Sequence, residues 1–115
     1  MSPKTVALRP IAAVVLALSL SGFVAAADVP TFQLTAKDGR FAPDTLEVPA
    51  GKKFKLIVNN EGPGPEEFES HELNREKVIP AGQKAEIFLG PLKAGTYGFF
   101  GEFHPQTAKG QIVAK

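Results

Sequence analysis

The chain has 115 residues, with 13 Lys and Arg, 12 Asp and Glu, one methionine and no cysteine, and its formal net charge is +1. This length allows one small domain, and without cysteine that domain cannot be held together by disulfides. The near-neutral charge, with no basic stripe or Arg-rich tract, gives no indication of nucleic-acid binding.

Residues 1–27 are predicted to be a secretory signal peptide. Lys4 and Arg9 form a basic leader, an apolar run at 11–20 is too short to span a bilayer, and Ala25–Ala27 supply the small residues of a cleavage site. We therefore expect a periplasmic protein with no stable membrane insertion after the signal is removed; an uncleaved membrane anchor is the alternative. Cleavage removes Lys4 and Arg9, so the net charge of the mature chain becomes −1.

The mature chain is predicted to be all-β, because short alternations of apolar and polar residues are separated by Gly and Pro. The clearest alternation places Phe54, Leu56 and Val58 on one face of a central strand. Pro43 confines its segment to a sheet edge or a bulge. In chain order the extended segments are 32–35, 41–48, 54–59, 66–73, 78–79, 85–89, 96–102 and 111–114.

These segments are typical of a β-sandwich. We predict a Greek-key antiparallel β-sandwich of about seven to eight short strands, forming one domain at 28–115. The segment 66–73 is the least regular of the series, and a single helical turn is expected near 71–76.

Two segments of the mature chain combine carboxylates with a histidine. Residues 66–72 read EEFESHE, and residues 102–104 read EFH. In a Greek-key sandwich, the end of a middle strand and the loop before the last strand can meet at one pole. Carboxylate and imidazole are hard to borderline ligands, which suit iron, copper(II), manganese or zinc. Crowded carboxylates also repel one another, and a bound cation would relieve that repulsion.

Strand alternation limits how the first segment binds an ion. It places Glu67 and Glu69 on one face and Glu66 and Phe68 on the other. The glutamates of this segment therefore cannot all bind one ion, which leaves two adjacent sites, or one site with an outer shell. A solvated acidic loop is the plain alternative. The predicted metal ligands are Glu66, Glu69, His71, Glu102 and His104.

Enzyme motifs of other kinds are missing from the sequence. It contains no nucleophile elbow, no glycine-rich phosphate loop that opens a helix, and no HExxH pair. No catalytic residue is therefore assigned.

Longer patterns carry a family resemblance. Residues 41–59 contain F-x-P-x-x-L-x-V-x-x-G-x-x-F-x-L-x-V, and residues 91–97 read PLKAGTY. Both resemble bacterial cupredoxin-like domains, and the resemblance covers almost all of 30–115. Within that superfamily, 67–82 and 99–105 resemble small periplasmic proteins of bacterial iron-uptake systems. Those proteins are associated with a high-affinity iron permease and a second periplasmic iron-binding protein.

The resemblance implies a role in handling ferrous iron before transport, with oxidation of Fe(II), helped by copper, as a further expectation. The implied cofactors are iron and/or copper(II) in a non-blue site, and the implied partners are the permease and the second iron-binding protein. By position, Glu66 stands where many cupredoxins have their first histidine ligand, and His104 matches the loop histidine. Gly101 replaces the cysteine of a blue-copper site, and Thr107 or Ala108 replaces its methionine.

Two other functions remain open. The domain is either a metal-free interaction module that docks on an iron permease or a periplasmic partner, or a degenerate electron-transfer protein. The second needs a redox centre that these side chains supply only with iron. The distance from the carboxyl group of Glu66 or Glu69 to the imidazole of His104 distinguishes metal binding from docking. Ligand distances are roughly 2 Å, so a separation of well over ~10 Å would prevent one ion from binding both groups.

Overall fold

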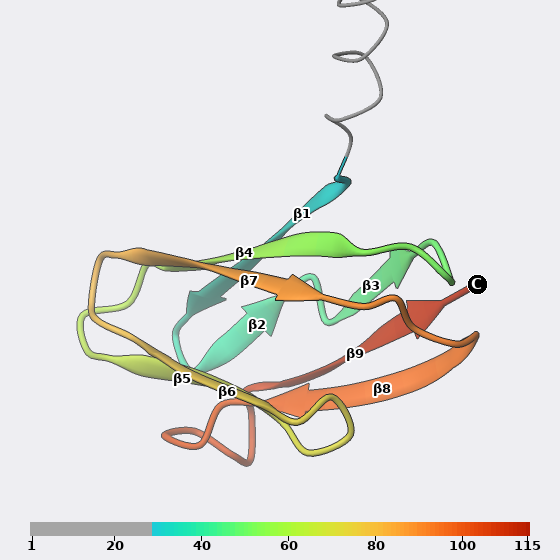
Figure 1. Cartoon of the computed structure of the whole chain (residues 1–115). Helices are drawn as coiled ribbons and strands as arrows, with labels where there is room; N and C mark the ends of the chain where they lie inside the picture. Colours follow the sequence, from blue (N-terminus) through green and yellow to red (C-terminus); the bar gives the residue numbers. More distant parts are fainter. Residues whose placement is uncertain (1–28) are drawn as a thin grey trace, which may run out of the picture.

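The computed structural model describes residues 29–115, which form two β-sheets packed face to face (Figure 1). The strands are β1 (Thr31–Lys37), β2 (Arg40–Ala42), β3 (Thr45–Val48), β4 (Phe54–Asn60), β5 (Glu66–Ser70), β6 (Arg75–Ile79), β7 (Lys84–Leu89), β8 (Gly95–Phe100) and β9 (Lys109–Ala114). No helix in this part of the chain is long and apolar enough to cross a bilayer. The predicted signal peptide, 1–27, lies outside the described residues.

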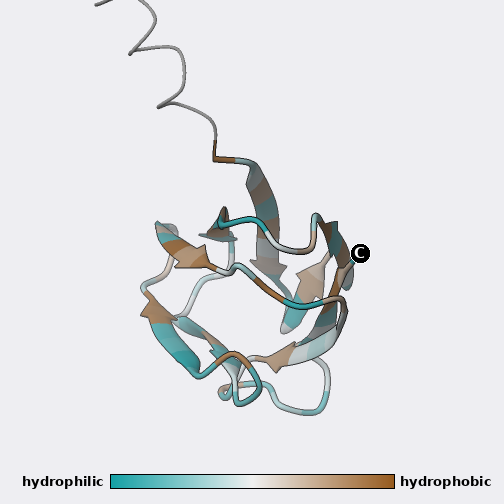
Figure 2. Ribbon diagram, turned by 45° about the vertical axis from the view of Figure 1, so that its right-hand side comes forward, coloured by the Kyte–Doolittle hydropathy of each residue, from teal (hydrophilic) through white to brown (hydrophobic). Residues whose placement is uncertain are grey.

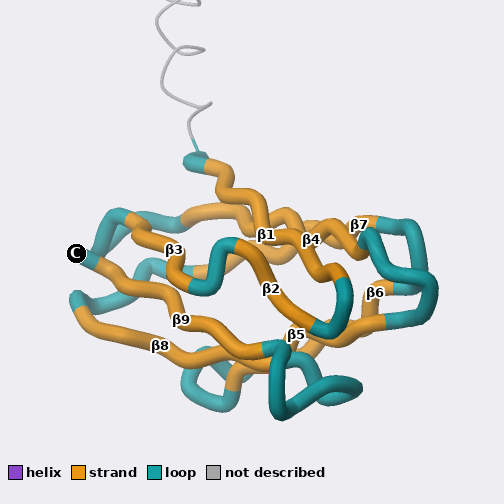
Figure 3. The backbone as a smooth tube through the Cα atoms, turned by 180° about the vertical axis from the view of Figure 1, so that it is seen from behind, coloured by secondary structure: helices purple, strands orange, loops and turns teal. Residues whose placement is uncertain are grey.

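The strand order is β2-β1-β4-β7 in one sheet and β3-β9-β8-β5-β6 in the other, which confirms the predicted β-sandwich. Two pairings, β1 with β4 and β3 with β9, are parallel, whereas the prediction was antiparallel throughout. The chain passes from one sheet to the other between β2 and β3, at residues 43–44 (Figure 3). The segment expected as one edge strand, 41–48, is therefore divided into β2 and β3.

The inner faces of the sheets supply the core, and this core sets the orientation of β5. Phe54, Leu56 and Val58 of β4 are fully buried, as their alternation predicts. Phe68 packs from the opposite sheet, with its ring centroid 5.1 Å from that of Phe99. Hydrophilic and hydrophobic residues alternate along the strands in Figure 2. Because Phe68 points inward, its neighbours in β5 point to the outer face of the sheet.

The prediction of a helical turn near 71–76 is wrong. Strands β5 and β6 instead form an antiparallel hairpin, whose turn occupies residues 71–74. Asn74 has φ = 55°, a left-handed conformation that asparagine adopts more readily than most residues, and its amide donates to the carbonyl of His71 at 3.2 Å. The hairpin register places Glu69 opposite Glu76.

The loop between β8 and β9, residues 101–108, lies against the start of β5 and the β1–β2 turn. The amide of Gly101 donates to the carbonyl of Ala108 at 2.8 Å, which closes the loop. The hydroxyl of Thr107 donates to the carbonyl of Gly39 at 2.5 Å, which fastens the loop to the turn. Two histidine- and glutamate-bearing segments that are distant in the sequence are thus brought to one end of the sandwich.

Candidate metal centre

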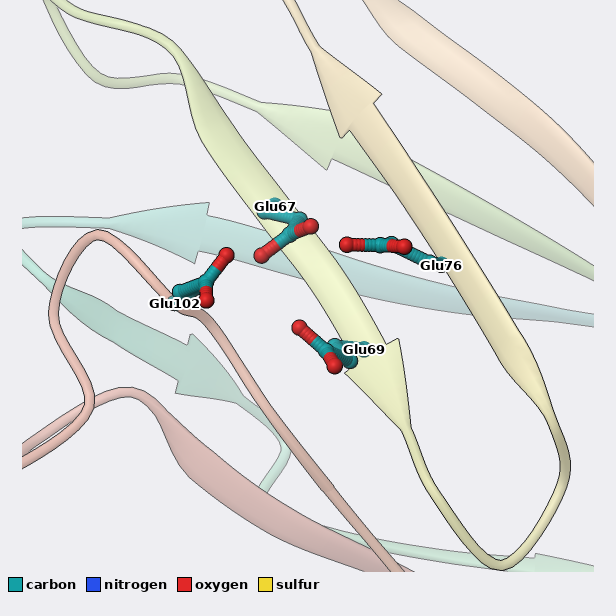
Figure 4. Close-up of side chains that lie close together, drawn as sticks. All are labelled: Glu67, Glu69, Glu76 and Glu102. Carbon is teal, nitrogen blue, oxygen red and sulfur yellow. The ribbon is translucent and has the colours of Figure 1, made fainter.

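Four glutamates converge on the outer face of the five-stranded sheet, beside the β8–β9 loop (Figure 4). One carboxylate oxygen from each of Glu67, Glu69, Glu76 and Glu102 lies within 4.8 Å of those of the other three. Within residues 29–115, no other group of three or more His, Asp or Glu side chains meets in this way. Carboxylate oxygens held this close are an oxygen-rich ligand set for a hard or borderline cation.

Each member of this cluster, which we call the tetraglutamate cluster, has a simple structural reason for its place. Glu67 and Glu69 flank the inward-pointing Phe68 and so share the outer face of β5. Glu76 is the cross-strand partner of Glu69 in β6. Glu102 is delivered by the β8–β9 loop, which follows the strand that pairs with β5.

Burial makes this cluster electrostatically unfavourable without a cation. Glu67 is only 2% exposed. Its Oε1 atom and the Oε1 atom of Glu69 are buried without a hydrogen-bond partner. No Lys or Arg nitrogen in the described part of the chain forms an ion pair with the cluster; the basic side chain in contact with it is His71, whose Nε2 lies 3.0 Å from Oε2 of Glu69. Buried acceptors without partners cost free energy that a coordinated cation would recover.

The pKa of Glu67 reflects this environment. Burial raises it from 4.5 to about 8, helped by the neighbouring carboxyl groups of Glu76, Glu102 and Glu69. Glu67 therefore holds its proton at neutral pH in the metal-free protein. Such a shift is a common feature of functional sites, and a proton shared between carboxylates is what remains when no cation balances them.

The five residues predicted from the sequence lie in two groups. Glu69 and Glu102 belong to the tetraglutamate cluster, and His71 contacts Glu69 while its ring packs edge-on against Phe100 at a centroid distance of 5.3 Å. Glu66 and His104 form a separate pair, in which Nδ1 of His104 lies 2.7 Å from Oε2 of Glu66. Because Glu66 shares the inner face with Phe68, this pair lies on the other side of β5 from the cluster.

A pocket of about 370 Å³ opens beside the Glu66–His104 pair. It is lined by the β1–β2 turn, by the loop at 62–65 and by Asn60. The amide nitrogen of Asn60 donates to the carbonyls of Gly64 and Ile79, each at 2.9 Å, and this fixes the 62–65 wall. One wall of the pocket is therefore held by hydrogen bonds, and His104 is among the lining residues.

Comparison with known proteins assigns the family. The sequence profile of the family described as "Cupredoxin-like domain" matches residues 10–114. The chain belongs to the cupredoxin-like family. An uncharacterized protein of Rickettsia prowazekii (strain Madrid E) is 46% identical to this cupredoxin-like chain over 81 residues, which is 70% of the chain. The matched part spans 65% of that relative's length.

Solved structures show the same fold. Auracyanin A, a "blue" copper protein from Chloroflexus aurantiacus, superposes with a TM-score of 0.66 at 13% identity, covering 76% of this chain and all of the other. Amicyanin from Paracoccus versutus superposes with a TM-score of 0.59 at 16% identity, covering 77% and 83% of the two chains. At these identities the likeness concerns the cupredoxin fold alone.

The residues of this cupredoxin-like protein do not fit a blue-copper centre. Such a centre needs a cysteine thiolate, and the sequence has no cysteine. At Gly101, which replaces that cysteine by position, an added Cβ would lie 2.7 Å from Oε1 of Glu66. The space next to the backbone at this position is therefore filled by a carboxylate. The tetraglutamate cluster instead offers only carboxylate oxygens, which are the hard donors of a non-blue site for a hard or borderline cation.

Two cluster members, Glu67 and Glu76, were not among the predicted ligands. Glu67 has a clear sequence signal, because strand alternation places it on the same face as Glu69. Glu76 has none in its own segment: its position depends on the hairpin register, which is fixed by the turn at Asn74. The helical turn expected near 71–76 included Glu76 and predicted no strand pairing for it.

Proposed function

We propose that this cupredoxin-like protein binds iron and/or copper(II) at the tetraglutamate cluster and acts in the periplasm in support of ferrous iron uptake. The observation that carries the proposal is the buried, unpartnered Oε1 atom of Glu67 in a group of four carboxylates whose oxygens lie within 4.8 Å. A site of this kind is costly to fold without a cation and is compatible with the ligand preferences of both metals.

The ligand chemistry favours loss of an electron from bound ferrous iron. Hard carboxylate oxygens stabilise Fe(III) more than Fe(II), so binding at the cluster lowers the reduction potential of the iron. Oxidation then requires an external electron acceptor, for which copper(II) is our candidate. Phe100 packs edge-on against the His71 ring beside the cluster.

The family resemblance of residues 67–82 and 99–105 supports the physiological setting. It suggests an iron permease and a second periplasmic iron-binding protein as partners. Secretion by the signal at 1–27 would place the protein in the compartment where these partners act. A metal-free docking module is the competing function, and the metal titration below separates the two.

The test is a calorimetric titration of the mature protein with Fe(II) under anaerobic conditions and, separately, with Cu(II). We expect saturable binding of at least one of these ions to the wild type and a loss of affinity of more than tenfold in the Glu67→Gln/Glu69→Gln double variant. Glu61→Gln, which removes an exposed carboxylate in the β4–β5 loop, is the matched control and should titrate like the wild type. Identical titrations of the wild type and the double variant would contradict the proposal and leave the docking function.

Oxidation is measured separately from binding. The rate at which Fe(II) disappears is followed with a ferrous chelator for the wild type, for each variant and without protein. Each measurement is made with and without Cu(II). We expect the wild type, but not the double variant, to accelerate the loss of Fe(II). Binding without acceleration would restrict the function to iron carriage.

A further inference from the structure

The Glu66–His104 pair has a geometry that suits positioning better than ligation. Both oxygens of Glu66 already have partners: Oε2 lies 2.7 Å from Nδ1 of His104, and Oε1 accepts from the amide of Glu67 at 3.0 Å. The residue is 4% exposed and faces the inner side of β5. A buried carboxylate whose two oxygens both accept hydrogen bonds is satisfied without a cation.

The β8–β9 loop is built around this pair. The amide of His104 donates to the carbonyl of Gly101 at 3.1 Å, and its carbonyl accepts from the amide of Ala108 at 2.8 Å. Gly101 passes so close to Glu66 that an added Cβ would lie 2.7 Å from its Oε1 atom. On its other side, the His104 ring packs against Gly39, whose added Cβ would lie 3.1 Å from the ring. The imidazole is thus held between β5 and the β1–β2 turn.

Glu102 depends on this arrangement for its place. It is exposed, it comes from the loop rather than from a strand, and it lies two residues before His104. The other three cluster members are fixed by the register of the β5–β6 hairpin. Beyond the backbone pairing of Phe100 with Glu69, the hydrogen bond across 38 residues between His104 and Glu66 is the side-chain contact that ties the Glu102 segment to the strand that carries Glu67 and Glu69.

We propose that Glu66 and His104 act as a latch that positions Glu102 on the tetraglutamate cluster, and that neither residue is itself a ligand. The cluster as a cation site rests on the proposed function above. The latch itself is a property of the metal-free fold. Removal of residues that orient a metal ligand typically weakens metal affinity about 10- to 100-fold.

The first experiment tests the latch without any metal. Amide hydrogen exchange of the mature protein is measured in wild type, His104→Ala, His104→Asn and Glu61→Gln. In His104→Ala we expect faster exchange at the amides of Gly101 and Ala108, with the core amide of Leu56 unchanged. His104→Asn keeps a donor that reaches Glu66 and should restore protection. Unchanged exchange at the loop amides in His104→Ala would overturn the latch.

The second experiment asks whether the latch acts through Glu102, with Cu(II) as the probe in calorimetry. Glu102→Gln and His104→Ala are each expected to weaken Cu(II) binding by about tenfold or more, and the double variant to be no weaker than the worse single variant. Glu66→Gln should keep most of the affinity, since an amide oxygen accepts from the Glu67 amide and an amide N–H donates to Nδ1 of His104. Additive losses, or a Glu66→Gln loss as large as that of Glu66→Ala, would make these residues ligands and overturn the proposal.

The outcomes separate the two proposals. A wild type that binds no Fe(II) or Cu(II) contradicts the metal function, while the hydrogen-exchange result still decides the latch. A wild type that binds Cu(II) with an affinity that His104→Ala leaves unchanged supports the metal function and contradicts the latch.

Discussion

Glu69 and Glu76 lie directly opposite each other in the β5–β6 hairpin, on the outer face of the sheet. Like charges in this position destabilise a β-sheet, by roughly 0.2–1 kcal/mol per pair. The chain therefore keeps, at an edge hairpin, a pair that folding alone does not favour. The opposed carboxylates should therefore lower the stability of the metal-free protein and raise its affinity for a cation.

Glu76→Gln should separate these two effects. In the presence of a chelator we expect the variant to be more stable than the wild type, by about 0.2–1 kcal/mol, because one charge of the opposed pair is removed. In metal titrations the same variant should bind more weakly, because it loses a carboxylate ligand. Urea unfolding and calorimetry check the two parts, with Glu61→Gln as the control. A variant that is less stable than the wild type without metal would contradict the proposed repulsion.

The raised pKa of Glu67 predicts how the stability of the metal-free protein depends on pH. The carboxyl titrates near 4.5 when unfolded and at about 8 when folded. Between these values the folded state binds more protons than the unfolded state, so the free energy of unfolding contributed by this group falls as pH rises through the window. Below the unfolded pKa, the contribution is fully present.

Glu67→Gln should remove this dependence. We expect wild type and variant to have similar stability at pH 4, and the variant to be the more stable of the two at pH 9. Urea unfolding with a chelator at several pH values provides the measurement. A variant that follows the wild-type pH profile, as Glu61→Gln should, would rule out Glu67 as the source of the slope.

Local patterns in the sequence predicted the framework of the fold, and long-range register limited the prediction of the site. The alternation at Phe54, Leu56 and Val58 depends only on neighbouring residues and is confirmed by their complete burial. The placement of Glu67 and Glu69 on the strand face opposite Phe68 likewise depends only on neighbouring residues. Strand pairing is not local: the parallel pairing of β3 with β9 joins segments more than sixty residues apart, and no short pattern specifies it.

The same distinction explains the site. Glu76 reaches the cluster only because the hairpin turns at Asn74, a detail that the expected helical turn concealed. The pairing of Glu66 with His104 spans 38 residues, and the expectation that both residues lie at one pole came from Greek-key topology and from the family resemblance. Neither source distinguishes a ligand from a residue that positions a loop, because that distinction depends on which oxygens are already hydrogen-bonded.

The ligand inventory predicts the colour of the copper-loaded protein. Without a cysteine in the sequence, Cu(II) bound to the carboxylates of the cluster should show only weak visible absorption. The measurement is an absorption spectrum of the mature protein after addition of one equivalent of Cu(II). An intense thiolate-type band would be incompatible with oxygen and nitrogen ligation.

The aromatic core predicts a large difference between two phenylalanines. Phe68 is fully buried, and its ring lies 5.1 Å from that of Phe99 and 6.4 Å from that of Phe41. Phe68→Ala should therefore cost about 3–5 kcal/mol of stability and disturb the strand that carries the cluster. Phe88 is 47% exposed and lies beneath the ammonium group of Lys53 at 5.0 Å, so Phe88→Ala should cost about 1 kcal/mol or less. Urea unfolding of both variants would show equal losses if the core were not centred on Phe68.

Two glycines give the sharpest test of how closely the β8–β9 loop packs on β5. A Cβ at Gly101 would lie 2.7 Å from Oε1 of Glu66 and 3.0 Å from the carbonyl oxygen of Glu67, whereas a Cβ at Gly64 would meet nothing within 4 Å. Because Glu66 is held by two hydrogen bonds, it cannot move aside cheaply. Gly101→Ala should therefore destabilise the protein by about 1–3 kcal/mol, and Gly64→Ala should leave its stability nearly unchanged. Equal urea midpoints for the two variants would mean that the loop and Glu66 separate without cost, and that the close approach at Gly101 does not constrain the site.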